Sequence, residues 1–304
     1  MLASQQIIVR SRFLAVDRHK KRKGENRTNM AYFTTKDNCN IYYEEHGSGE
    51  PLIFIHGWSC NHKFFKYQVD EFAKNYRVIL YDFRGHGQSD RSEVTERGMN
   101  LNRFAADLHE LIEYLKLDQV YAVGWSMGTS TLLAYAREFK CQYIKKMCFI
   151  DMTPKLLNDP EWKLGQSCTF DIVQNLQFMA AIAVSWEFAA KLFIPNVFAK
   201  DYDQKSDEFK WVAQQALDNT PHCMMNMWIA MAIEDFRDVL PTIKIPVLLT
   251  YSGDGLLYGP SHGEYMKEHL GGESRLVIFP GCGHGLFLED PEKFNRELKD
   301  FLKG

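Results

Sequence analysis

Apolar residues occur in short runs that are spaced along most of the chain and bounded by turn-forming residues. From about residue 30, the strand-like pieces AYFTT and NIYYEEH flank a polar KDNC segment and predict a β-hairpin. Six further runs are apolar at successive positions, which is typical of buried strands in a largely parallel sheet. These runs are PLIFIHG, RVILYDF, QVYAVGW, KKMCFID, PVLLTYS and RLVIFPG.

Helical patterns lie between several of these runs. One helical face is formed by Phe104, Leu108, Leu111, Ile112 and Leu115. Near the end of the chain, PEKFNRELKDFL opens with Pro291, a residue suited to the first helical position. Strands that alternate with helices predict an open, mostly parallel α/β sheet flanked by helices.

The alternation stops over residues 155–242, which contain no strand-like run. This segment holds four of the six tryptophans and several methionines. We expect residues 30–154 and 243–304 to form one α/β core and residues 155–242 to form an inserted helical cap. A chain of 304 residues is long enough for such a core with an insertion.

The first 29 residues differ in charge from the rest of the chain. They hold eight Lys or Arg and two acidic residues, although the net charge of the whole chain is −3. They lack the apolar segment and cleavage site of a secretory signal, so we expect a disordered basic leader, with the folded unit beginning at Met30. A basic arm or a targeting segment is the alternative interpretation.

Charge, hydropathy and cysteine content exclude several classes of protein. The acidic remainder of the chain argues against a nucleic-acid-binding surface. No uncharged apolar run approaches the roughly 18 residues that a membrane span needs, so a protein without a membrane span is expected. The seven cysteines are odd in number and lack C-x₂-C spacing, which favours reduced thiols in a cytoplasmic protein without a metal site. Nothing in the composition fixes an oligomeric state.

A candidate nucleophile lies in VGWSMGTS, residues 123–130, between a predicted strand and a predicted helix. Ser126 is flanked by Gly124 and Gly128 in a G-x-S-x-G pattern. A serine at so sharp a corner needs small neighbours two residues away, because strand and helix approach closely there. The helix that follows also directs its positive N-terminus toward the serine.

A serine hydroxyl needs a base and an oxyanion site before it can act as a nucleophile. His284 lies in the glycine-rich loop after the last strand run, where open α/β sheets build their sites. The loop after the strand that ends in His56 and Gly57 can supply backbone donors, so we expect the N–H groups of Trp58 and Met127 to form the oxyanion hole. We interpret His56 as a residue that fixes this loop.

Four motifs in one order resemble the α/β-hydrolases over roughly residues 31–304. They are HGW at 56–58, DFRGHGQS at 82–89, GWSMG at 124–128 and GCGH at 281–284. The resemblance implies an eight-stranded sheet, a helical cap and a serine hydrolase mechanism that needs no cofactor. The GWSMG motif and the oxyanion loop with Trp58 are similar to cofactor-free haloperoxidases and perhydrolase-like esterases. In the family, the residues at Asp82 and Arg84 are usually structural.

The acid that orients His284 has two candidates. Family members usually place it about nine residues after the proline that opens the penultimate strand; counting from Pro246 reaches Gly255, and Asp254 is one residue early. Some members, haloalkane dehalogenases among them, place it after the strand that follows the nucleophile helix, which corresponds to Asp151. We favour Asp151 and keep Asp254 as the alternative.

The predicted function is hydrolysis of a small to medium, largely apolar carboxylic ester through an acyl-enzyme. Trp58 and Trp125 lie next to the motifs and are expected to line the substrate pocket, and the Trp- and Met-rich cap suggests an apolar wall. Lactone hydrolysis, perhydrolysis and C–C bond hydrolysis would use the same residues. A receptor of the same fold that binds a ligand without turnover is the alternative from another class.

Overall fold

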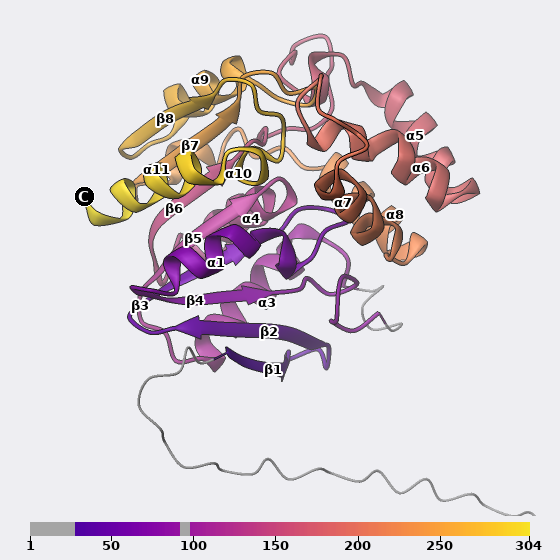
Figure 1. The fold of residues 1–304 in the computed structure, drawn as a ribbon. Helices are drawn as coiled ribbons and strands as arrows, with labels where there is room; N and C mark the ends of the chain where they lie inside the picture. The colour runs from indigo at the N-terminus through magenta and orange to yellow at the C-terminus, as the bar shows by residue number, and fades with distance from the viewer. Residues whose placement is uncertain (1–27, 92–97) are drawn as a thin grey trace, which may run out of the picture.

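Eight strands pair into one sheet within residues 28–91 and 98–304, the parts of the chain that this computed structural model describes (Figure 1). The order across the sheet is β1-β2-β4-β3-β5-β6-β7-β8, and the predicted eight-stranded, mostly parallel sheet is confirmed. The pairs β1–β2 and β2–β4 are antiparallel, and all other neighbours are parallel. The strands are β1 Thr28–Thr34, β2 Asn40–Gly47, β3 Glu50–Ile55, β4 Tyr76–Tyr81, β5 Val120–Trp125, β6 Ile144–Ile150, β7 Val247–Ser252 and β8 Ser274–Phe279.

The predicted hairpin forms, but it starts earlier than expected. Strand β1 begins at Thr28, which pairs with His46, so the expectation that the folded unit begins at Met30 is wrong by two residues. Backbone pairing with β2 extends β1 toward the N-terminus, beyond the first apolar residue of the predicted strand. The rest of the predicted basic leader, residues 1–27, lies outside the described residues.

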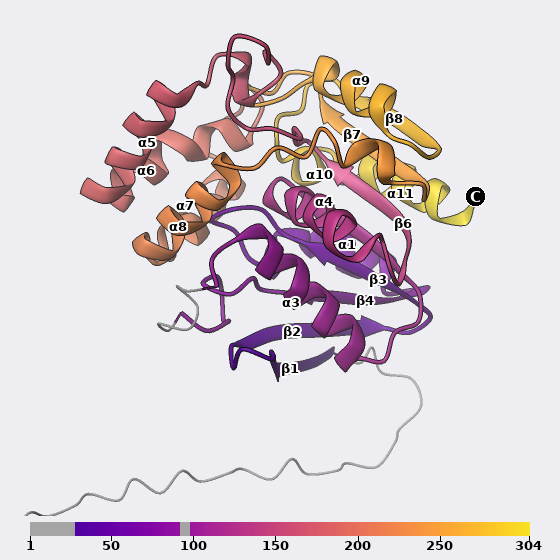
Figure 2. The ribbon, with the colours of Figure 1, turned by 180° about the vertical axis from the view of Figure 1, so that it is seen from behind.

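Helices cover both faces of the sheet. Figure 1 shows α1 and α11 in front of it, and Figure 2, from behind, shows α3 and α4. Helix α11 begins at Pro291, as the sequence predicts, and α3 carries the predicted apolar face. The helices of the core are η1 His62–Phe65, α1 Lys66–Phe72, α3 Leu101–Tyr114, α4 Met127–Phe139, η4 Leu240–Thr242, α9 Pro260–His269, α10 Leu286–Glu289 and α11 Pro291–Lys303.

A group of helices between β6 and β7 lies apart from the sheet, with α5 and α6 outermost in both views (Figures 1 and 2). Its two ends meet: Lys155 and Asp235 form an antiparallel bridge, and the N–H of Phe236 donates to the Pro154 carbonyl at 2.9 Å. We call this group the cap. Its elements are η2 Gln166–Cys168, α5 Ile172–Val184, α6 Trp186–Phe193, η3 Ile194–Val197, α7 Asp207–Leu217 and α8 Pro221–Ala232.

None of the helices in the described parts of the chain has both the length and the apolar character that crossing a membrane requires.

Candidate active site

Ser126 occupies the sharp corner between β5 and α4. Its φ of 55° and ψ of −118° are strained for a residue with a side chain, and such strain is typical of functional sites. The N–H of Ser126 donates to the Ile150 carbonyl at 3.1 Å, which ties the corner to the end of β6. The serine is therefore held at the carboxyl edge of the parallel strands.

Gly124 and Gly128 make this corner possible because backbone crowds both of them. A Cβ at Gly124 would lie 2.6 Å from the Gly128 carbonyl carbon, and a Cβ at Gly128 would lie 2.2 Å from the Ile55 oxygen. Real Cβ atoms do not approach backbone so closely, so any larger residue would push β5, α4 or β3 apart. This is the steric reason that the sequence pattern suggested.

Asp151 and His284 come together from the ends of β6 and β8. The Nδ1–H of His284 donates to Asp151 Oδ2 at 2.8 Å, and both side chains are buried. Asp151 Oδ1 accepts the Ser252 N–H at 2.9 Å, and the Ser252 hydroxyl lies 3.0 Å away. With its Nδ1 proton engaged, a neutral imidazole presents the Nε2 lone pair, which is the tautomer that a base needs.

Asp254, the alternative acid, is placed elsewhere. Its carboxylate Oδ2 accepts the N–H of Gly281 at 2.7 Å, in an exposed part of the loop before His284. The structure thus brings Asp151 to the histidine and uses Asp254 to hold the turn at Gly281.

His284 is joined to the strand of Ser126 through Trp125. The indole N–H of Trp125 donates to the His284 carbonyl at 2.9 Å, and the two ring centroids are 5.3 Å apart. Within the described residues there is no hydrogen bond between Ser126 Oγ and His284 Nε2. Contacts of this kind are often long in structures without substrate and shorten when substrate binds.

The loop that follows β3 packs directly against the serine. A Cβ on Gly57 would lie 3.2 Å from the Ser126 Cβ, so the backbone from Gly57 to Trp58 borders the reaction centre. No hydrogen bond among the described residues uses the N–H of Trp58 or of Met127. The N–H of Met127 belongs to the first turn of α4, where such groups have no partner within the helix. Both groups are thus available as donors.

Two buried histidines fix the shape of this loop. The Nδ1–H of His56 donates to the Gly57 carbonyl at 2.8 Å, while its Nε2 accepts the Phe83 N–H at 3.1 Å. Burial lowers the pKa of His56 to about 4, so it stays neutral. His86 Nε2 accepts the N–H of Ser59 at 3.1 Å. His56 has the loop-fixing geometry that we expected, whereas sequence reasoning missed His86.

The loop that carries His284 is clamped by residues that sequence reasoning also missed. Glu289 accepts the N–H of Gly283 at 2.7 Å and that of Ala199 at 2.9 Å. The N–H of Gly285 donates to the Val197 carbonyl at 2.6 Å. Sequence reasoning also missed Ser252, which contacts Asp151; a polar residue at the end of an apolar strand run is the signal that could have identified it. These contacts join the base loop to the cap.

Asp82 and Arg84 lie in buried ion pairs away from Ser126. Arg84 forms two hydrogen bonds of 2.7 Å with Asp107 and two with Asp37. Burial alone would raise the pKa of Asp82, but the hydrogen bond and charge of His62 lower it. The geometry is structural, as the resemblance implied.

The two tryptophans expected to touch substrate differ in position. Trp125 is 1% exposed and packs on Phe64 and Phe287 in the core. Trp58 points into the cap, where its ring contacts those of Phe178, Trp186, Phe193 and Trp228 at centroid distances of 4.9 to 6.0 Å.

A cavity of about 210 Å³ adjoins this aromatic cluster. Phe178, Phe193 and Trp228 line it on the cap side, and Leu256 and Leu257, from the loop after β7, line the other side. The ring of the next residue, Tyr258, lies 5.5 Å from the His284 ring. Its lining residues thus contact the ring of Trp58 on one side and adjoin Tyr258 on the other, while Trp58, Ser126 and His284 themselves are not among them.

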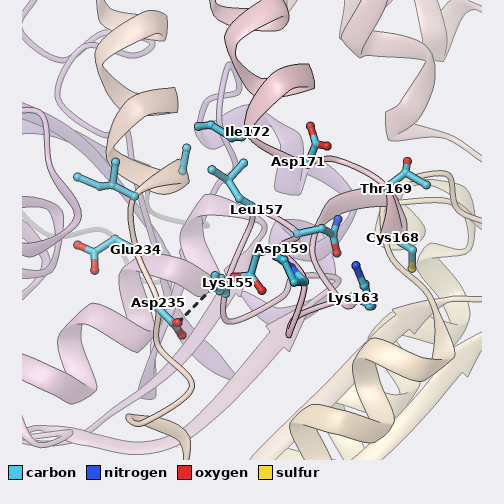
Figure 3. Close-up of a pocket in the computed structure, with 14 residues that line it drawn as sticks. Lys155, Leu157, Asp159, Lys163, Cys168, Thr169, Asp171, Ile172, Glu234 and Asp235 are labelled. Atoms are coloured by element: carbon cyan, nitrogen blue, oxygen red, sulfur yellow. Dashed lines mark hydrogen bonds and ion pairs between the residues drawn. The ribbon is translucent and has the colours of Figure 1, made fainter.

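A larger depression of about 1020 Å³ lies at the base of the cap (Figure 3). Lys155 in its wall is paired with Asp159 and with Asp235. No histidine is among its 14 lining residues, and none of the predicted site residues borders it. It contains neither the strained serine nor the Asp151–His284 pair, so the candidate active site is the one at Ser126.

Comparison with known proteins places most of the chain in one family. The model of the Alpha/beta hydrolase family matches residues 52–297. The AB hydrolase superfamily protein YisY of Bacillus subtilis is 28% identical over 273 residues, which cover 89% of this chain and 98% of that protein.

Solved structures agree with this assignment. An esterase from Exiguobacterium antarcticum superposes with a TM-score of 0.82 at 28% identity, covering 90% of this chain and 99% of that one. A bromoperoxidase from Bacillus anthracis gives 0.83 at 28% identity, covering 91% and 100%. The predicted similarity to esterases and haloperoxidases is confirmed, and the chain belongs to the alpha/beta hydrolase family.

Proposed function

We propose that this hydrolase is a serine esterase that cleaves small to medium, largely apolar carboxylic esters through an acyl-enzyme intermediate. The observation that carries the proposal is the 2.8 Å hydrogen bond from His284 to Asp151, beside the strained corner of Ser126. A nucleophile, a base in the required tautomer and a carboxylate to orient it form the constellation that acyl transfer uses.

In the first half of the reaction, Ser126 Oγ attacks the acyl carbon while His284 Nε2 accepts its proton. The N–H groups of Trp58 and Met127 hold the negative charge that develops on the carbonyl oxygen. His284 then gives the proton to the leaving alkoxide, and the acyl group stays on Ser126. Asp151 stabilises the imidazolium formed between these steps.

In the second half, His284 removes a proton from water, which attacks the acyl-enzyme; His284 then returns this proton to Ser126 Oγ as the bond to the acyl group breaks and the acid is released. The proposed cycle uses protein groups and water alone. A small-molecule substrate is the partner that it requires.

The proposal is tested with a fluorophosphonate probe and a soluble ester such as p-nitrophenyl butyrate. We expect covalent labelling and hydrolysis by the wild-type protein, and loss of both in Ser126→Ala. The variant should fold normally, because only a hydroxyl is removed. Folded wild-type protein that neither labels nor hydrolyses any ester would favour the ligand-receptor alternative instead.

Perhydrolysis is the second candidate, and the similarity to a bromoperoxidase favours it. Here hydrogen peroxide replaces water as the acceptor of the acyl group, giving a peracid. Lactonase and C–C hydrolase activities would use the same residues, so a panel of esters with and without peroxide, lactones and diketones separates the candidates by kcat/KM.

A further inference from the structure

Helix α5 exposes an apolar face to solvent along its whole length. The helix, IVQNLQFMAAIAV, contains no charged residue, and Asn175 and Ile182 are the members that it buries. At 100° per residue, most of its exposed side chains fall on one continuous strip. These are Ile172, Val173, Leu176, Gln177, Ala180, Ala183 and Val184, and Val184 is 85% exposed.

Helix α6 continues this surface beside α5 (Figures 1 and 2). Phe188 and Leu192 are exposed one helical turn apart. The two charges of α6, Glu187 and Lys191, form an ion pair with each other, so the helix adds no net charge. We call the exposed apolar side chains of both helices the α5–α6 face.

The α5–α6 face runs into the cavity next to Trp58. Leu192 belongs to both, since it lines the cavity and is 52% exposed. Leu256, which is 41% exposed, and the exposed Ser167 also line the cavity, so the cavity reaches solvent at these residues. Phe178 of α5 lines the cavity from inside and contacts the ring of Trp58.

We propose that the α5–α6 face docks on the surface of an uncharged lipid aggregate, from which the apolar chain of an ester enters the cavity between Leu192 and Leu256. This inference rests on the proposed esterase function and narrows its substrate to esters held in a lipid phase. An exposed apolar surface of this extent marks an interaction site in soluble proteins.

The chemistry of the face selects an uncharged lipid surface. Interfacial helices that bind anionic membranes carry Lys and Arg beside the apolar strip. Here α5 has no charged side chain, and Lys191 is already paired with Glu187. Binding would therefore depend on the apolar area buried and would be nearly insensitive to salt.

The test compares Val173→Ser/Val184→Ser with Met30→Ser. The two valines lie on the α5–α6 face and do not line the cavity. Serine and valine have similar helix propensities, so α5 should persist. Met30 is 65% exposed on β1, which lies far from the cap in Figure 1, and its variant is the matched control for loss of exposed apolar surface.

Hydrolysis of tributyrin is measured below and above its solubility limit. The wild type and Met30→Ser should show a rise in rate of several-fold once droplets form. The double variant should keep the rate on dissolved tributyrin and lose most of this rise. Flotation with phosphatidylcholine vesicles is measured in proteins that also carry Ser126→Ala. The partition coefficient of the double valine variant should be about tenfold lower, because two valine side chains that would be buried in the lipid are lost.

The outcomes separate this inference from the esterase proposal. Hydrolysis of dissolved tributyrin without a rise on droplets and without flotation would overturn the docking inference alone. Flotation that the valine substitutions abolish, with no hydrolysis of dissolved ester, would support docking and contradict the esterase function. Binding to anionic vesicles alone, or a wild-type dimer that the double variant dissociates, would overturn docking on uncharged lipid.

Discussion

At the scale of single residues, the contrast between Asp151 and Asp254 shows what the sequence could not decide. Both follow predicted strands and both could face His284. A backbone group distinguishes them: the N–H of Gly281 donates a hydrogen bond to the Asp254 carboxylate, whereas Ser252 and His284 donate to Asp151. Backbone donors leave no mark in a sequence pattern, so the sequence favoured Asp151 without excluding Asp254.

Asparagine at each position tests the assignment. Asp151→Asn should lower kcat by about 10⁴-fold, because an amide no longer holds His284 in the required tautomer. Asp254→Asn, the matched control, should leave kcat nearly unchanged. Steady-state hydrolysis of p-nitrophenyl butyrate measures both. Small and equal losses would mean that neither residue is the acid.

The two tryptophans illustrate the same limit. Trp58 and Trp125 both lie beside a motif, and sequence reasoning gave them the same role. Trp125 belongs to a strand whose neighbours in the sheet and helices on the faces enclose it completely, whereas Trp58 lies on a loop that faces the cap. Proximity in sequence to the motifs did not distinguish a side chain packed within the core from one packed against the aromatic rings of the cap.

At the scale of elements, the corner from β5 to α4 was predictable because its requirements are local. The apolar run predicted the strand, the helical pattern that follows predicted the helix, and the spacing of the two glycines predicted the sharp corner between them. The loop after β3 was less predictable, since its shape depends on His86, which is 27 residues from Ser59 in sequence. Long-range contacts of this kind appear only when the sheet has formed.

Alanine at Gly128 tests the steric account of the corner. The added Cβ would lie 2.2 Å from the Ile55 oxygen, so we expect the free energy of unfolding to fall by about 3 kcal/mol or more. At Gly259 the nearest atom to an added Cβ is 3.8 Å away, and alanine there should have little effect. Urea denaturation of both variants gives the comparison. Equal stabilities would refute the crowding argument.

At the scale of the whole molecule, the architecture was predictable from the apolar strand runs and the helical insertion, whereas the networks of buried charged residues were not. His62 is a member of such a network: its Nδ1 lies 2.8 Å from Asp82 and its Nε2 lies 3.2 Å from Glu44. Burial alone would lower the pKa of His62, but the two carboxylates outweigh it and raise the pKa to about 9. His62 therefore carries a positive charge at neutral pH.

This raised pKa links stability to pH. Because the folded-state value of about 9 exceeds the unfolded value of 6.5, the stabilisation is fully present below pH 6.5 and is lost as pH rises through 9. We expect the difference in unfolding free energy between wild type and His62→Gln to be up to about 3 kcal/mol larger at pH 6 than at pH 10. Denaturant titrations at both pH values measure it, and a pH-independent difference would contradict the linkage.

The bridge between Lys155 and Asp235 brings the start and the finish of the cap side by side. Any helical segment whose ends are equally close could be grafted at this point without changing the spacing of β6 and β7, which carry Asp151 and Ser252. Substrate range could thus diversify by exchange of one contiguous stretch of chain, while the groups that form and break bonds stay on the sheet.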